Sequence, residues 1–398
     1  MSNFTKAIFI VGAKRTAFGT FGGAFKNVTQ TQLQTAACRG ALKASGVNPT
    51  DVDSVVIGNV MSLTSSDGIY LPRHTALQCG VPIETPALGI NRLCGSGFQS
   101  IINGAQDIEL GVAKIALTGG VENMSQAPYV ARNMRFGTVL GTNYTLEDSL
   151  WLGLTDSYCK LPMALTAENL AEKYNITRQE VDEFALKSQK NWKKGQDEGA
   201  FSSEIEPFTL RIKGKDASFA VDEHPRPQTT IESLSKLPSL FKKNGTVTAG
   251  TASGICDGAA AVVVASEEAV KEHDLKPLAR LVAYSTVGVP PEIMGFGPVP
   301  AINNLLKASG VKMQDIDLIE INEAFGVQVL ACAKQLNCDM DKLNVNGGAI
   351  ALGHPLAASG SRITAHLVHE LRRKSLKRAV GAACIGGGQG IAVLLEAV

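Results

Sequence analysis

Apolar residues occur along the chain in short runs, and polar or glycine-rich stretches separate these runs. The runs Ala7–Val11, Leu318–Ile321 and Ala379–Ala383 are apolar or nearly so, which predicts strands buried on both faces. Between residues 98 and 110, apolar residues return every three or four positions, which predicts an amphipathic helix. Strands that alternate with helices of this kind indicate an α/β fold.

The middle of the chain differs from the rest in its charge content. Residues 121–247 contain 33 charged residues in 127, whereas the other 271 residues contain 42. This segment includes a helical pattern from Thr166 to Gly195 and a Pro- and Lys-rich portion, Pro207–Lys243, with little periodicity. We therefore predict a loop-rich insertion, and such insertions are common places for ligand contacts.

An internal repeat frames the insertion. The segment Leu42–Val47 recurs as Leu306–Val311 at an offset of 264, and each copy is followed by two aspartates and an apolar stretch. Each copy is typical of a helix that ends at glycine, then a loop and a buried strand. The repeat predicts two similar halves, residues 1–269, which contain the insertion 121–247, and residues 270–398.

Composition and charge exclude several classes of protein. The chain has 38 Lys and Arg against 37 Asp and Glu, a formal net charge of +1, so we expect no nucleic-acid partner. The uncharged stretch Ala379–Leu395 contains glycines and is shorter than the roughly 20 apolar residues of a membrane helix. The eight cysteines include no CxxC pair, so we expect neither a disulfide framework nor a metal site, and a reducing compartment.

The first 50 residues contain basic residues but no Asp or Glu. Acid-poor, basic N-termini are typical of mitochondrial import signals. The same pattern also fits the ordinary composition of the first strand and helix, and these two interpretations are equally well supported by the residues themselves.

Cys94 lies in the glycine-flanked segment Asn91–Phe98, directly before the predicted helix. At a helix N-terminus, free backbone N–H groups and the helix dipole favour a thiolate, so we predict a pKa below the ordinary value and a nucleophilic sulfur. The alternative is a small buried apolar residue, which is the commoner role of a free cysteine.

Three glycine-rich segments in the second half each present a polar side chain. Asn322 follows the run Leu318–Ile321, His354 ends a glycine-rich stretch, and Cys384 follows Ala379–Ala383. In α/β folds, binding sites are commonly formed by polar groups at strand ends, beside glycines that let a ligand approach the backbone closely. The structural alternatives are a helix cap, a turn histidine and a buried strand residue.

A second histidine pattern, His366 and His369 with Glu370, falls on a predicted helix. No third metal ligand is nearby in the sequence, so we predict that this cluster lies on a solvent-exposed helix face and binds no metal.

Four motifs in order give the sequence a family resemblance. They are N-x-x-C-G-S-G around Cys94, N-E-A-F from Asn322, G-H-P around His354 and C-x-G-G-G from Cys384. This set resembles the signatures of the thiolases, most closely the mitochondrial 3-ketoacyl-CoA thiolases. The resemblance implies a five-layered αβαβα sandwich of two similar halves, an inserted loop domain that binds coenzyme A, and a homotetramer built from dimers.

The resemblance also assigns roles in thiolytic cleavage of 3-ketoacyl-CoA to acetyl-CoA and a shortened acyl-CoA during fatty-acid β-oxidation. Cys94 is expected to carry the acyl group, His354 to accept its proton, and Asn322 to hold a water beside His354. Cys384 is expected to act as general acid and base. The backbone N–H groups of Cys94 and Gly386 are expected to stabilise an oxyanion.

Coenzyme A recognition is assigned by the same resemblance to Arg226 and Thr229, for adenine and phosphate, and to Ser253, for pantetheine. Arg suits this task because its planar fork binds phosphate and stacks on adenine. The expected partners are 3-ketoacyl-CoA, acetyl-CoA and CoA, with CoA as a co-substrate and no further cofactor.

Two departures from the family pattern bear on function. Lys160–Met163 stands where biosynthetic short-chain thiolases have His-Met-Gly, which favours a degradative enzyme. Ala357 replaces a usual glycine near His354. The alternatives are an acetoacetyl-CoA thiolase, a thioester hydrolase on the same acyl-enzyme, and a non-catalytic acyl-CoA binder. With the acid-free N-terminus, the resemblance predicts the mitochondrial matrix and an uncleaved signal.

Overall fold

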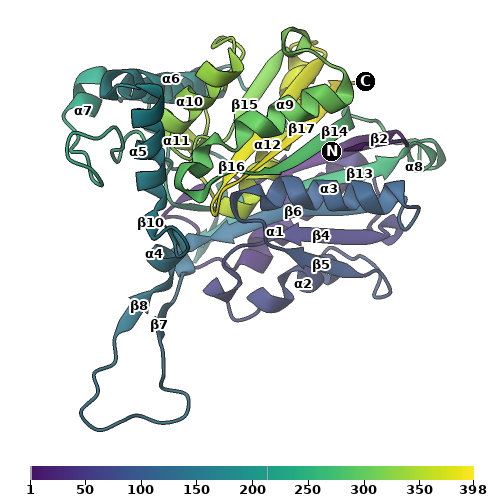
Figure 1. Cartoon of the computed structure of the whole chain (residues 1–398). Helices are drawn as coiled ribbons and strands as arrows, with labels where there is room; N and C mark the ends of the chain where they lie inside the picture. The colour runs from purple at the N-terminus through teal and green to yellow at the C-terminus, as the bar shows by residue number, and fades with distance from the viewer. Residues whose placement is uncertain (1, 213) are drawn as a thin grey trace.

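The computed structural model describes residues 2–212 and 214–398, and it shows an α/β protein in which two halves share one continuous sheet (Figure 1). The first half contains β1 (Ser2–Asn3), β2 (Ile8–Arg15), β3 (Gly19–Thr20), α1 (Gln30–Ser45), β4 (Ser54–Gly58), α2 (Leu71–Gln78), β5 (Ala87–Ile90), α3 (Ser96–Glu109), β6 (Ile115–Asn123), β13 (Cys256–Ser266) and α8 (Glu267–Glu272). The second half contains β14 (Ala279–Gly288), α9 (Pro298–Ser309), β15 (Leu318–Ile321), α10 (Gly326–Leu336), α11 (Ala349–Leu352), α12 (Ser359–Arg373), β16 (Arg378–Ile385) and β17 (Gln389–Ala397).

The sequence repeat corresponds to a structural repeat. Helices α1 and α9 both end at a left-handed glycine, Gly46 at φ 75° and Gly310 at φ 70°, a conformation that glycine adopts without steric cost. Further along each copy, Asp53 and Asp317 accept backbone N–H groups at the start of β6 and β16, respectively. The two halves therefore repeat not only helices and strands but also the polar contacts that join them.

Five layers follow from how the helices cover the sheet. The strand order is β15-β16-β17-β14-β2-β13-β6-β4-β5, and β14 joins β2 where the two halves meet. Helices α1 and α2 cover the first half from outside, and α9 and α10 cover the second. Helices α3 and α12 lie between the halves and pack on both, around a core of aliphatic side chains. The predicted αβαβα sandwich is confirmed.

The two central helices meet at their first turns. A Cβ atom on Gly97 of α3 would lie 2.5 Å from the backbone nitrogen of Ser361, and one on Gly360 of α12 would lie 2.2 Å from the backbone nitrogen of Phe98. Only glycine fits such a contact between backbones. The hydroxyl of Ser361 donates to the carbonyl of Gly97 (3.1 Å) across the same junction.

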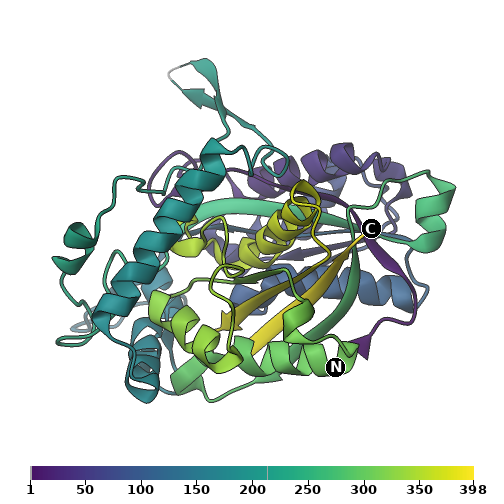
Figure 2. The same ribbon diagram turned by 90° about the horizontal axis from the view of Figure 1, so that it is seen from above.

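The insertion between β6 and β13 forms a side domain. It contains β7 (Tyr129–Ala131), β8 (Leu146–Asp148), α4 (Ser149–Gly153), β9 (Thr155–Asp156), β10 (Leu161–Pro162), α5 (Met163–Tyr174), α6 (Arg178–Asp197), β11 (Phe208–Ile212), β12 (Lys215–Phe219) and α7 (Ile231–Ser235). Strands β7 and β8 carry an arm that projects from the body in Figure 1. Figure 2 shows the long teal helix α6 beside the sheet and the β11–β12 hairpin projecting from the molecule.

The single helix predicted from Thr166 to Gly195 is wrong, because the structure has two helices there. Helix α5 ends at Asn175, which adopts the left-handed conformation at φ 50°. Helix α6 begins anew after Thr177, whose side chain and that of Glu180 form a reciprocal capping box. The break lets α5 and α6 pack on α10 separately.

A buried charge network attaches the insertion to both halves. Arg15 of β2 pairs with Glu204 (2.6 Å) and Asp222 (2.7 Å) of the insertion, and Glu204 also pairs with Nδ1 of His366 on α12 (2.7 Å). The predicted solvent-exposed position of His366 is therefore wrong, since the side chain is buried. The helix pattern could not reveal a partner 162 residues away.

Replacing Glu204 by Gln should destabilise the fold, because it leaves His366 buried without its carboxylate partner and Arg15 with Asp222 alone. We expect a loss of about 3–5 kcal/mol in the free energy of unfolding. Burial alone would raise the pKa of Glu204, but His366 and Arg15 lower it to about 2. Burial alone would lower the pKa of His366, but Glu204 raises it.

The direction of each pKa shift decides the pH range over which Glu204 and His366 stabilise the fold. The Glu204 contribution is present above its unfolded pKa and is lost as pH falls toward 2. The His366 contribution is present below its unfolded pKa and is lost as pH rises through the raised folded value. Urea unfolding should therefore show a larger wild-type advantage over Glu204→Gln at about pH 5.5 than at about pH 8. The control is Asp216→Asn, at an exposed position of β12. If Asp216→Asn lowered the free energy of unfolding as much as Glu204→Gln does, the prediction would be wrong.

Within residues 2–212 and 214–398, the structure contains no helix with the length and apolar character needed to span a bilayer.

Candidate active site

Cys94 lies on a sharp turn between β5 and α3. It belongs to a 3₁₀ turn, η4 (Leu93–Gly95), and Leu93 before it has φ 47°, an unusual conformation for a branched side chain. Three hydrogen bonds hold this turn: the N–H of Leu93 donates to Asn91 (2.9 Å), the N–H of Arg92 donates to the Ser96 hydroxyl (2.8 Å), and that hydroxyl donates to the carbonyl of Leu93 (2.7 Å). Backbone strain fixed in this way is typical of a functional position.

The low pKa predicted for the thiol of Cys94 is wrong. Burial raises the pKa of this thiol to about 11, although the backbone N–H groups of Gly386 and of Cys94 itself act to lower it. The helix end does point donors at the sulfur, but the apolar surroundings outweigh them. The resting group is therefore a thiol, and it needs a proton acceptor before it can attack.

Cys384 approaches the same point from the other half. It is the next-to-last residue of β16 and fully buried, and β16 packs against the η4 turn that carries Cys94. Burial raises the pKa of the Cys384 thiol well above its ordinary value, and the thiols of Cys94 and Cys332 raise it further. The structure thus brings together two cysteines that are 290 positions apart in the sequence.

Gly386 follows in the β16–β17 hairpin, and its backbone N–H points toward the sulfur of Cys94. A Cβ atom here would lie 3.3 Å from Leu93 and 3.4 Å from Met163, so a side chain would crowd the space beside the sulfur. The N–H groups of Cys94 and Gly386 therefore converge on one small region, as a pair of oxyanion donors must.

His354 is 5% exposed and follows α11. Its Nδ1 contacts the Ser359 hydroxyl (2.5 Å), and that hydroxyl donates to the carbonyl of Pro355, so Nδ1 carries a proton and Ser359 accepts it. Its Nε2 faces the side-chain nitrogen of Asn322 at 3.2 Å, which donates to the ring lone pair. Because burial and the charge of Arg362 lower the pKa of His354 to about 3, the resting imidazole is neutral, and its Nε2 lone pair accepts from Asn322.

Glu122 was missed in the sequence. This carboxylate on β6 accepts the N–H groups of Met61 (2.9 Å), Val60 (3.3 Å) and Ala357 (3.2 Å), and burial raises its pKa to about 7 despite these bonds. It therefore fixes the loop that follows His354 through the N–H of Ala357. The sequence did contain a signal for Glu122, because it is the one acidic residue in the otherwise uncharged strand β6.

A cavity of about 190 Å³ leads from the imidazole to the insertion. Its walls are mostly apolar, and they are formed by Met124, Trp151, Leu154, Pro162, Met163, Ala164, Phe241, Ala252, Ser253, Gly254, Ile255, Phe325, His354 and Leu356. The rings of Trp151 and Phe241 stack at 6.4 Å between centroids, and both come from the insertion. This shape suits an extended, weakly polar chain.

The residues expected to bind CoA occupy two adjacent places. Ser253 lines the cavity with His354, and its N–H donates to the carbonyl of Ala324 (3.0 Å). Arg226 and Thr229 lie outside the cavity walls, in a turn in which the Thr229 hydroxyl donates to the carbonyl of Arg226 (2.7 Å). The two places adjoin because His224 packs against Gly254.

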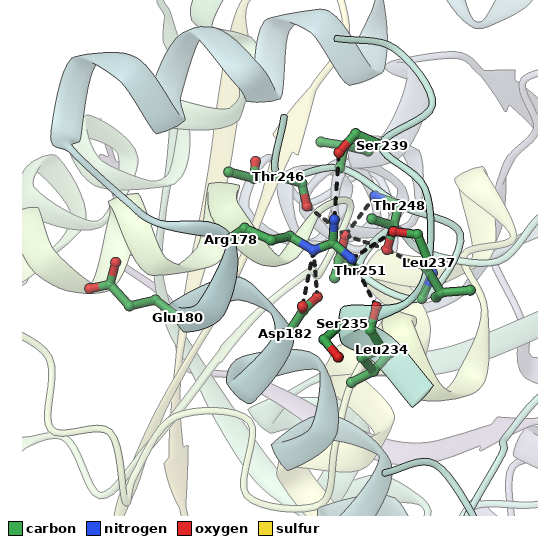
Figure 3. Close-up of polar contacts among 12 residues, drawn as sticks. Arg178, Glu180, Asp182, Leu234, Ser235, Leu237, Ser239, Thr246, Thr248 and Thr251 are labelled. Carbon is green, nitrogen blue, oxygen red and sulfur yellow. Dashed lines mark hydrogen bonds and ion pairs between the residues drawn. The ribbon is translucent and has the colours of Figure 1, made fainter. Parts of the chain in front are cut away.

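Arg178 holds the segment between α7 and Phe241, and Figure 3 shows its contacts with this segment. Its guanidinium donates to the carbonyls of Leu234 (2.8 Å) and Leu237 (2.9 Å) and pairs with Asp182 (2.9 Å). Beyond it, the hydroxyl of Thr251 donates to the carbonyl of Thr246 (3.0 Å). These bonds fix the chain that carries Phe241 and leads to Ser253.

The fold and this site place the chain in a family: it belongs to the thiolases. The model of the thiolase N-terminal domain matches residues 8–268, and that of the C-terminal domain matches residues 275–397.

The chain is similar in full length to individual thiolases. It is 59% identical over 391 residues to a mitochondrial 3-ketoacyl-CoA thiolase of Homo sapiens, covering 98% of both chains. The crystal structure of the human mitochondrial enzyme in complex with CoA matches with a TM-score of 0.97 and 58% identity, covering 100% of this chain and 99% of that one. The acetyl-CoA acetyltransferase of Bacillus anthracis matches with a TM-score of 0.95 and 44% identity, covering 100% of both chains.

Within the described part of the chain, no three His, Cys, Asp or Glu side chains gather in a way that could hold a metal ion.

Proposed function

We propose that this protein is a 3-ketoacyl-CoA thiolase, which cleaves 3-ketoacyl-CoA with CoA to acetyl-CoA and an acyl-CoA two carbons shorter. The observation that carries the proposal is that the turn with Cys94 packs against β16, which carries Cys384, and against Leu356–Ala358, which follows His354, while the neutral imidazole of His354 lines an apolar cavity. The human relative crystallised with CoA supports the same substrate class.

In the first half-reaction, Cys94 attacks the 3-keto carbon while Nε2 of His354 takes the thiol proton. The bond between C2 and C3 then breaks, the acyl group stays on Cys94, and the electron pair passes to the acetyl-CoA enolate. The imidazolium and a water held by Asn322 stabilise the enolate oxygen, and Cys384 donates a proton to C2. The high pKa of the Cys384 thiol keeps this proton available at neutral pH.

In the second half-reaction, CoA attacks the acyl-enzyme. Cys384, now a thiolate, takes the proton of the CoA thiol, and the new sulfur attacks the carbonyl carbon. The oxyanion that forms lies between the N–H groups of Cys94 and Gly386, each of which contributes about 3–4 kcal/mol in such a position. Collapse of this intermediate releases acyl-CoA and returns the proton from His354 to Cys94.

The nucleotide end of CoA is assigned to Arg226 and Thr229, and the pantetheine to the cavity beside Ser253. Arg226 is exposed, so its guanidinium is available to a ligand.

We expect Arg226→Ala to raise the KM for CoA by about ten-fold with little change in kcat, because the side chain is remote from the reacting carbon. Steady-state kinetics at varied CoA, with exposed Lys215→Ala in the same insertion as control, tests this. An unchanged KM would remove Arg226 from the site.

Four chains are proposed to assemble as a dimer of dimers. Two exposed apolar surfaces support this. One lies at the end of the sheet, where β5 is the last strand and Leu88, Ile69 and Tyr70 are more than half exposed. The other is the β7–β8 arm, where Phe136 and Leu140 are fully exposed. Sedimentation equilibrium should give four times the chain mass of 41.9 kDa, and a monomer would contradict the assignment.

The mitochondrial matrix is the proposed location. The printed names of the relatives include "mitochondrial", and the first 50 residues are basic and free of Asp and Glu. We propose that the signal is not cleaved, because strand β2 lies in the centre of the sheet and Arg15 in the buried network. Subcellular fractionation followed by N-terminal sequencing tests both statements.

A thiolysis assay with 3-ketoacyl-CoAs of increasing chain length tests the activity. We expect CoA-dependent loss of substrate with formation of acetyl-CoA, and little thioester hydrolysis in a control without free CoA. Activity confined to acetoacetyl-CoA would instead indicate an acetoacetyl-CoA thiolase. Release of free acid in the control would indicate a hydrolase.

A further inference from the structure

One glutamine of the insertion contacts both the turn assigned to CoA and the helix that leads to His354. Gln189 lies on α6 and is 7% exposed. Its side-chain oxygen accepts the N–H of Arg226 (2.8 Å), and its side-chain nitrogen donates to the carbonyl of Ile350 in α11 (3.3 Å). The roles assigned above do not include this residue.

The chemistry of the two partners matches an amide side chain. Arg226 offers a backbone donor and Ile350 a backbone acceptor, so the side chain between them has to accept and donate at once. These fixed roles also decide which end of the amide faces which segment. An ionised glutamate only accepts, and an apolar side chain does neither, so neither of them makes both contacts.

Helix α11 has only four residues, and groups outside the helix bind the peptide groups of Ile350. The N–H of Ile350 donates to Glu323 (3.0 Å), which directly follows Asn322, and its carbonyl accepts from Gln189. Backbone groups at the ends of a helix have no partner within the helix, so outside partners of this kind fix its position. Helix α11 is therefore held from the side of Asn322 and from the side of the insertion.

Ser188, the residue before Gln189, holds the same helix end. Its hydroxyl donates to Glu323 (2.7 Å) and accepts the N–H of Gly348 (3.2 Å), which directly precedes α11. Ser188 thus fixes α6 against α11, and Gln189 extends this contact to the turn that begins at Arg226.

The position of α11 determines the position of the imidazole. His354 is the second residue after α11, and its N–H donates to the carbonyl of Gly254 (2.9 Å). Gly353, between them, has φ 95°, and a Cβ atom there would lie 2.5 Å from Sγ of Cys256, so this link is closely packed. A shift of α11 is therefore passed on to His354 and to its contact with Asn322 (3.2 Å).

We propose that Gln189 is a positioning residue that couples binding of the CoA nucleotide at Arg226 to the alignment of His354. When a nucleotide orders the turn of residues 226–229, the N–H of Arg226 is fixed, and with it the amide of Gln189 and the carbonyl of Ile350. Binding energy from a remote part of the substrate is then used to orient the imidazole, which raises kcat. This inference rests on the proposed function for the assignment of Arg226 to CoA.

Hydrogen exchange followed by mass spectrometry tests the coupling without thiolysis. The probe is adenosine 3′-phosphate 5′-diphosphate, the nucleotide part of CoA, which has no pantetheine to enter the cavity. In the wild type, saturating probe should slow exchange several-fold in residues 224–229 and also in residues 349–354, where the amides of Ile350 and His354 are hydrogen-bonded. In Q189M, which removes both bonds with a side chain of similar length, slowing should remain in residues 224–229 alone.

The control is Q179M, at an exposed glutamine of the same helix, and it should behave like the wild type. Slowing in residues 224–229 alone in the wild type would overturn the coupling and leave the CoA assignment intact. Slowing in neither segment would overturn both, because the nucleotide would then not bind at Arg226. Equal behaviour of Q179M and Q189M would remove Gln189 from the proposed role.

Turnover separates the two bonds and provides a second variant if Q189M does not fold. At about pH 8, the ionised side chain of Q189E still accepts the N–H of Arg226 but has no donor for Ile350. We expect its kcat to fall roughly ten-fold while the KM for CoA stays near the wild-type value, the reverse of the pattern expected for Arg226→Ala. Wild-type kinetics in Q189E, or a raised KM with unchanged kcat, would overturn the proposal.

Discussion

Substituting alanine for Cys94 is expected to reduce thiolysis by roughly 10⁴-fold or more, because this change removes the atom that carries the acyl group. Neither neighbouring thiol can replace it: Cys384 is fully buried in β16, and Cys332 lies within α10. Incubation with a radiolabelled 3-ketoacyl-CoA, followed by acid precipitation, should show label on wild-type protein and none on Cys94→Ala.

The control for this experiment is Cys159→Ala, a partly exposed thiol in the insertion that takes no part in the proposed reaction. It should label and turn over like the wild type. Label retained on Cys94→Ala, at any other residue, would show that the acyl group is carried elsewhere, and the proposed mechanism would then be wrong.

The second large effect is expected from Cys384→Ala, which should lower kcat by about 10²- to 10⁴-fold while leaving Cys94 able to accept an acyl group. The general acid is lost, but the nucleophile, the imidazole and the N–H donors of Cys94 and Gly386 remain. Mass spectrometry of the protein after exposure to acetyl-CoA should detect acetylated Cys94, whereas steady-state thiolysis should be almost absent.

Cys332→Ala provides a matched control for this variant, because its thiol also lies near Cys384 but donates to the carbonyl of Gly295 (3.2 Å). It should retain turnover. If Cys384→Ala turned over at the wild-type rate, proton transfer at C2 would have to be assigned to another group.

Much of the fold was predictable because its signals are local. The repeat of Leu42–Val47 at Leu306–Val311 reflects a helix end that requires glycine in the left-handed conformation, and Gly46 and Gly310 both adopt it. The apolar runs became the strands β2, β15 and β16 for a similar reason, since strands buried on both faces are mostly apolar.

What could not be predicted depends on contacts between distant segments. His366 was expected at the surface because the sequence offers no third metal ligand near it, but it is buried and pairs with Glu204 of the insertion. The pKa of Cys94 was expected to be low from the helix end alone, and burial by the second half reversed the direction. Glu122 and Arg362 were likewise missed, since their partners come from other elements.

The contact between Gly97 and Gly360 has an electrostatic consequence. It brings the N-terminal ends of α3 and α12 together, and each end carries a partial positive charge. The two like poles repel each other in the resting enzyme, where the thiols and the imidazole of the site are neutral. An anion that forms at this point, whether enolate or tetrahedral oxyanion, relieves that repulsion, so the backbone itself favours the transition state over the ground state.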